Sequence, residues 1–148
     1  MPTIKANQID LYYEVHGQGE PLVFAAGFNT DHHVFDKFID IYKKHFQVIV
    51  FDYRGTGESS APEMSYTIEM MADDLMALCD GLHIDKCYFV GVSMGVFVLL
   101  NLAARYPHRC KKLVLSNNAV KLDPRMALLM QLNLELLKAG VDQKLVVK

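Results

Sequence analysis

The chain has 148 residues, of which 51% are hydrophobic and 22% charged, and its formal net charge is −2. This length suits one domain with a real hydrophobic core. A near-neutral balance without a basic block argues against nucleic acid or an anionic membrane surface as the main partner. No apolar run approaches the roughly 18 residues of a membrane-spanning helix, and the first residues lack the charged-then-apolar layout of a signal peptide.

Short β-rich runs alternate with helical patterns along the chain. Strands are expected over residues 9–15, 22–26, 47–51, 87–92 and 113–115. Helices are expected over residues 30–44, 65–82 and 94–106, with Ser65 or Thr67 as the N-cap of the second. This alternation predicts an α/β fold, with a mostly parallel sheet and helices on both faces.

Two further features concern the end of the chain and its thiols. Asp123 and Pro124 could open an apolar helix that stops at Gly140. The cysteines (Cys79, Cys87 and Cys110) are odd in number and have no metal-ligand spacing. They predict reduced thiols in a cytoplasmic protein, without a bound metal.

Residues 87–95, CYFVGVSMG, place the pattern G-x-S-x-G between an apolar strand and an apolar helix. This is the setting of a nucleophile elbow, a strained turn that lifts the hydroxyl of Ser93 above the sheet. Gly91 and Gly95 are expected because a Cβ at either position would collide with the neighbouring strand or helix. The amide groups at the start of the following helix could stabilise a developing oxyanion.

Three segments together resemble the α/β-hydrolase family: the G-x-S-x-G segment, PLVFAAGF at residues 21–28, and FDYRGTGES at residues 51–59. They stand in the family's order and at family-like separations. Esterases, enol-lactone hydrolases and cofactor-free haloperoxidases are the most similar members.

The resemblance implies that Ser93 is the nucleophile and that the backbone N–H groups of Phe28 and Met94 form the oxyanion hole. It implies no metal or organic cofactor, and it does not indicate which residues bind the substrate. The chain departs from the family at Ala26, where many members have histidine, and at Val96, where many have a second glycine.

Residues 52–57 have two readings. We expect Asp52 and Arg54 to form a charged pair that, with Gly55 and Gly57, braces a tight turn near the site. A dinucleotide-binding loop is disfavoured because the third glycine is missing and no helix follows at once.

Ser93 needs a base, and in this fold the acid and then the histidine follow the serine in the chain. The one histidine after Ser93 is His108, with no acid between them, and it is expected in an exposed turn at the opposite end of the sheet. His32 and His33 lie beside the oxyanion loop. We favour a role at the start of a helix, with the pocket lining as an option, over that of general base.

The greater length of the family's members explains why no acid and histidine suited to Ser93 follow it in this chain. Residues 1–122 would be the N-terminal part of the hydrolase core and residues 123–148 the start of the cap, with the last strands, the acid and the histidine outside this truncated chain. The strand at 113–115 would then be an open edge that pairs with a second copy or with a complementing half.

The expected function is hydrolysis of a small, mostly apolar carboxylic ester or lactone through an acyl-enzyme on Ser93, with the isolated chain nearly inert. The alternatives are a non-catalytic module that binds a ligand or partner, and cofactor-free perhydrolysis or carbon–carbon bond cleavage on the same fold.

Overall fold

The structure is a computed structural model and describes residues 2–117, 124, 125, 128, 131, 132 and 135. The chain divides into two compact units, Met1–Asn118 and Ala119–Lys148. In the second unit the described positions are helical, and the rest of the helix expected from Asp123 to Gly140 lies outside the described residues.

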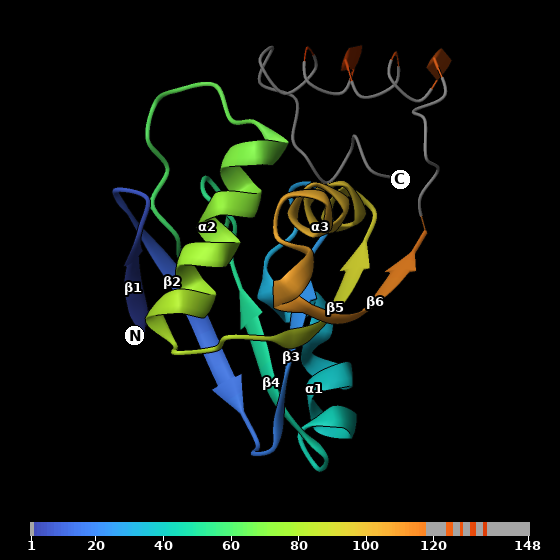
Figure 1. The fold of residues 1–148 in the computed structure, drawn as a ribbon. Helices are drawn as coiled ribbons and strands as arrows, with labels where there is room; N and C mark the ends of the chain where they lie inside the picture. Colours follow the sequence, from blue (N-terminus) through green and yellow to red (C-terminus); the bar gives the residue numbers. More distant parts are fainter. Residues whose placement is uncertain (1, 118–123, 126–127, 129–130, 133–134, 136–148) are drawn as a thin grey trace. The chain divides into compact units, whose positions relative to one another are not determined.

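Six strands form one sheet in the order β1-β2-β4-β3-β5-β6 (Figure 1). The strands are β1 (Thr3–Ala6), β2 (Ile9–His16), β3 (Glu20–Ala25), β4 (Phe46–Phe51), β5 (Cys87–Val92) and β6 (Cys110–Ser116). The pairings of β3 with β4, β3 with β5, and β5 with β6 are parallel, whereas β2 is antiparallel to β1 and to β4. The predicted mostly parallel sheet is confirmed.

The strand β1 was not predicted from the sequence. It pairs with β2 through a turn at Asn7 and Gln8, whose φ angles are 44° and 68°. Such two-residue hairpins favour glycine at the second position, and Gln8 gives no such signal.

The helical segments are η1 (His32–Phe35), α1 (Asp36–Tyr42), α2 (Ile68–Gly81), α3 (Met94–Arg105) and η2 (Pro107–Arg109). The first predicted helix is therefore a 3₁₀ turn followed by a short α-helix, with Asp31 as N-cap accepting the N–H of His33 at 3.0 Å. The N-cap of α2 is Thr67, whose side chain accepts the N–H of Met70.

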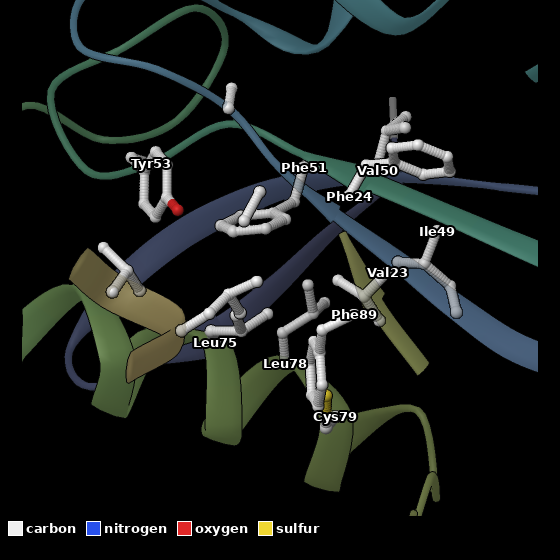
Figure 2. Packing of buried hydrophobic residues seen from close by; sticks show 14 of the residues in the cluster. Val23, Phe24, Ile49, Val50, Phe51, Tyr53, Leu75, Leu78, Cys79 and Phe89 are labelled. Carbon is white, nitrogen blue, oxygen red and sulfur yellow. The ribbon is translucent and has the colours of Figure 1, made fainter. Parts of the chain in front are cut away.

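The core fills both faces of the central strands. On one face, Val23, Phe51 and Phe89 pack with Leu75 and other residues of α2 (Figure 2). On the other face, the ring centroids of Phe24 and Phe35 lie 4.9 Å apart. Helices α2 and α3 cover one side of the sheet and α1 the other (Figure 1), as all-apolar strands require.

The parallel strands β3, β4 and β5 all end at one edge of the sheet. Because their carboxyl ends meet there, three connecting segments are brought together: residues 26–31, residues 52–59 and the turn at Ser93. This is the edge where open α/β sheets place their binding sites.

Candidate active site

Ser93 occupies a sharp turn between β5 and α3. Its φ and ψ are 54° and −117°, a conformation that side-chain-bearing residues rarely adopt and that costs about 1–3 kcal/mol. The Ser93 N–H donates to the carbonyl of Ser116 at 3.1 Å, and its carbonyl accepts the N–H of Val96 at 3.0 Å. The serine is therefore held in a strained backbone by the neighbouring strand and by the first turn of α3.

The two glycines around Ser93 are required by close packing. A Cβ on Gly95 would lie 2.2 Å from the carbonyl oxygen of Ala25, at the end of β3. A Cβ on Gly91 would lie 2.8 Å from Leu99 Cδ1 and 3.0 Å from the backbone of Gly95. The predicted collisions with strand and helix are confirmed.

Val96, where many family members have a second glycine, is buried in the first turn of α3 with 5% of its surface exposed. Its side chain is thus part of the packing between the helix and the sheet. Ala26, which stands where many members have histidine, is 1% exposed.

The loop after β3 passes directly over Ser93. A Cβ built on Gly27 would lie 3.4 Å from Ser93 Cβ and 3.6 Å from Thr30 Oγ1. The Thr30 hydroxyl donates to the carbonyl oxygen of Gly27 at 3.0 Å. Phe28 follows Gly27, and its side chain is 64% exposed.

Helix α3 begins directly after Ser93. Met94 is the first residue of this helix, and the first N–H groups of a helix have no partner within it. Their aligned dipoles favour negative charge nearby. Met94 therefore follows Ser93 at the start of α3, and Phe28 follows Gly27, which lies close to Ser93. The roles of Phe28 and Met94 as oxyanion donors stay predictions.

Asp52 joins the loops after β3 and β4. Its Oδ1 accepts both the backbone N–H and the Nδ1–H of His32, at 2.8 and 2.9 Å, because a carboxylate can only accept. Its Oδ2 accepts the N–H of Glu58 at 3.0 Å. At Gly57, where φ is 50°, a Cβ would lie 2.2 Å from that Oδ2, so the glycine admits the carboxylate.

The predicted charged pair of Asp52 and Arg54 is wrong, although both residues do brace their turns. Arg54 instead forms a two-pronged ion pair with Asp74 of α2, at 2.6 and 2.7 Å. A carboxylate on the apolar face of α2, one turn from Met71 and Leu78, is the sequence signal that could have indicated this partner.

His32 is buried between two carboxylates. It is 4% exposed, its Nδ1 faces Asp52, and its Nε2 lies 3.6 Å from Glu14 Oε1. Both ring nitrogens therefore face carboxylates. His32 is the first residue of η1, which confirms the predicted role at the start of a helix, while the view that it is not the base for Ser93 stays a prediction. His33 is exposed and lies 3.4 Å from Asp36.

His108 lies where the sequence predicted. It is exposed in η2, just before β6. Cys110 at the start of β6 pairs with Cys87 at the start of β5, so His108 sits at the sheet edge opposite Ser93.

Three other observations bear on binding. Within the described residues, no group of three or more His, Cys, Asp or Glu side chains is arranged to hold a metal ion. In the same part of the chain, no helix combines the length and apolar character needed to cross a membrane. A cavity of about 600 Å³ lies between the β1–β2 turn and α2, lined by Asn7, Arg54 and Met70 among others, and does not include Ser93.

Comparison with known proteins agrees with this architecture. Residues 20–142 match the family model described as the alpha/beta hydrolase fold, and the chain belongs to this family.

Two curated relatives and one solved structure illustrate the likeness. The chain is 32% identical over 127 residues to 3-oxoadipate enol-lactonase 2 of Acinetobacter baylyi, covering 84% of this chain and 48% of the relative. It is 36% identical over 140 residues to RutD of Pantoea ananatis, provisionally named a carbamate hydrolase, covering 89% and 50%. The crystal structure of MGS-M2, an alpha/beta hydrolase enzyme from a Medee basin deep-sea metagenome library, superposes with a TM-score of 0.89 at 27% identity, covering 94% and 52%. The chain thus spans about half the length of these proteins.

Proposed function

We propose that this chain carries the nucleophile of a serine hydrolase that cleaves a small carboxylic ester or lactone. The observation that carries the proposal is the backbone of Ser93, held at φ 54° between β5 and α3. A fold tolerates such strain where the geometry serves a site. The enol-lactonase among the relatives supports a lactone or ester as substrate.

The proposed reaction has two steps. Ser93 Oγ attacks the carbonyl carbon while a base takes its proton, and the carbonyl oxygen becomes an oxyanion held by the N–H groups of Phe28 and Met94. The C–O bond to the leaving group then breaks, the leaving alkoxide takes the proton, and an acyl-enzyme remains. Water adds to the acyl carbon and loses a proton to the same base. The bond between the acyl carbon and Ser93 Oγ then breaks, Oγ takes that proton back from the base, and the carboxylic acid is released.

The base and its orienting acid are proposed to come from polypeptide outside residues 1–148. Both ring nitrogens of His32 face carboxylates, and His108 lies at the opposite sheet edge. Without the base we expect residues 1–148 alone to be nearly inert, since removing such a base from a serine hydrolase costs about 10⁶-fold in turnover.

A fluorophosphonate probe tests the nucleophile. We expect the complete protein to be labelled on Ser93 and the Ser93→Ala variant to remain unlabelled, with residues 1–148 alone labelled far more slowly. A folded, complete protein that is not labelled would instead favour a module that binds a ligand or partner without catalysis.

A substrate panel separates the remaining chemistries. Hydrolysis of aryl esters and lactones without peroxide supports the proposal. A requirement for peroxide, or turnover only of substrates with a scissile carbon–carbon bond, would contradict it. A carbamate is a useful further member of the panel, because the relative RutD of Pantoea ananatis is provisionally named a carbamate hydrolase.

The cytoplasm stays the proposed location, and it rests on the cysteines. Cys79, Cys87 and Cys110 are free thiols in the structure, and such thiols persist in reducing compartments.

A further inference from the structure

We infer that Thr30 is a positioning residue that aims the Phe28 N–H at the reacting carbonyl oxygen, an inference that rests on the proposed function. The Thr30 hydroxyl donates to the Gly27 carbonyl oxygen at 3.0 Å. That carbonyl and the Phe28 N–H belong to the same planar peptide unit.

The rigidity of the peptide unit transmits the contact. In a trans peptide the C=O and N–H bonds point in opposite directions within one plane, and the described backbone is trans throughout. Because Thr30 holds the Gly27 carbonyl pointing toward the Thr30 hydroxyl, the Phe28 N–H points away from that hydroxyl. The hydrogen bond therefore fixes one of the two oxyanion donors without touching the substrate.

The peptide unit is also in the right place. A Cβ on Gly27 would lie 3.4 Å from Ser93 Cβ and 3.6 Å from Thr30 Oγ1, so the serine and the threonine both lie close to this residue. The next residues turn sharply, because Asn29 has a φ of 54°. This turn brings the Thr30 side chain back over the Gly27 carbonyl.

The far end of the loop is anchored independently. Asp31 caps η1 by accepting the N–H of His33, and buried Asp52 accepts two donors of His32. Residues 31–33 are therefore fixed to the segment after β4. Between this anchor and the end of β3, the Thr30 hydroxyl donates a hydrogen bond directly to the Gly27–Phe28 peptide.

The test compares Thr30→Val, which keeps the shape and removes the hydroxyl, with Thr30→Ser, which keeps the hydroxyl. For an ester substrate we expect Thr30→Val to lower kcat by about tenfold to hundredfold, somewhat less than complete loss of an oxyanion donor, with KM almost unchanged. Thr30→Ser should recover most of kcat. Thr67→Val is the matched control, because it removes the hydroxyl that caps α2, and it should lower the melting temperature without changing kcat.

A second readout reports orientation directly. With ¹⁵N-labelled phenylalanine, the residual dipolar coupling of the Phe28 N–H should change in Thr30→Val and return in Thr30→Ser. Wild-type kcat in Thr30→Val, or a fall in kcat with an unchanged coupling, would overturn the inference. If wild-type protein neither hydrolyses esters nor is labelled on Ser93, the proposed function fails, and the catalytic part of this inference with it. The coupling then still decides whether Thr30 orients the peptide.

Discussion

Arg54 and Asp74 form an ion pair in the interior, with Nε to Oδ2 at 2.6 Å and the guanidinium NH2 group to Oδ1 at 2.7 Å. Asp74 is fully buried and also accepts from Asn7 Nδ2 at 3.0 Å. The hydrogen bonds that Arg54 donates to Asp74 raise the pKa of Arg54 above its ordinary value. One carboxylate thus connects the β1–β2 turn, the segment after β4 and helix α2.

Asp74→Asn should destabilise the fold by about 3–5 kcal/mol, because it leaves a buried guanidinium without a counter-charge. The matched control is Asp73→Asn on the same helix. Asp73 pairs with Arg105 at 2.6 Å, but both side chains are more than a third exposed, so the loss should be no more than about 1 kcal/mol. Urea unfolding of the two variants measures the difference. Equal losses in the free energy of unfolding would show that the buried pair stabilises the fold no more than the exposed pair does.

Much of the fold could be predicted from the sequence because the central strands are buried on both faces. Their all-apolar runs and the glycines around Ser93 report local requirements, namely burial and close packing. The hairpin of β1 could not be predicted, because its turn uses Asn7 and Gln8 instead of a glycine-containing pair.

The polar partners were harder to predict than the strands. Asp52 and Arg54 are close in the chain, which suggested an ion pair between them, yet each binds a residue distant in the sequence. Those partners, His32 and Asp74, come from elements that only the folded sheet brings near. The contact of Thr30 with the Gly27 carbonyl is local, but a threonine in a loop carries no signal that singles it out.

The backbone strain at Ser93 predicts an unusual order of variant stabilities. Ser93→Ala and Ser93→Gly both remove the hydroxyl, but only glycine adopts φ 54° and ψ −117° without steric cost. The relief, about 1–3 kcal/mol, exceeds the entropic cost of glycine, about 0.5–1 kcal/mol. Ser93→Gly should therefore be about 1 kcal/mol more stable than Ser93→Ala in chemical denaturation. The reverse order would mean that the turn is unstrained in solution.

The buried hydroxyl of Tyr53 predicts a stabilising substitution. Within the described residues this hydroxyl has no hydrogen-bond partner, and it lies among Phe51 and Leu75 (Figure 2). Burial also raises the pKa of Tyr53 well above its ordinary value.

Removing an unsatisfied buried group recovers its desolvation cost, so Tyr53→Phe should raise the free energy of unfolding by about 1 kcal/mol. Tyr66→Phe is the control. It loses a hydrogen bond to the carbonyl of Pro62 at 2.8 Å, and should lower stability by about 1 kcal/mol. Calorimetric unfolding measures both changes. If the two variants were both more stable, or both less stable, than wild type, the result would contradict this interpretation.

The bond between Tyr12 and Glu14 predicts a pH dependence. Tyr12 donates its hydroxyl to Glu14 Oε1 at 2.7 Å, and this hydrogen bond, together with burial and the nearby charge, raises the pKa of Tyr12 to about 12. The same bond lowers the pKa of Glu14.

Because the folded pKa of Tyr12 lies above the unfolded value of 10.0, its contribution to stability is complete below pH 10 and is lost as pH rises towards 12. Absorbance at 295 nm, compared between wild type and Tyr12→Phe, should show one phenol titrating near pH 12. In Glu14→Gln that phenol should titrate closer to pH 10. A midpoint that does not move would show that the carboxylate is not the cause.

The free side of β6 predicts self-association of residues 1–148. In the described part of the chain β6 pairs with β5 alone, and Val114 and Leu115 are 58% and 41% exposed. Successive residues of a strand point to opposite faces, so β6 exposes an apolar side chain on each face of the sheet. Its unpaired backbone can add a strand from a second copy. We expect light scattering to show a mass that rises with concentration.

Val114→Lys should shift the chain towards monomer, because a charge on an edge strand opposes pairing. Val15→Lys, on β2 at the far side of the sheet from β6 and 40% exposed, should not. A wild-type chain that stays monomeric at every concentration would exclude pairing through β6.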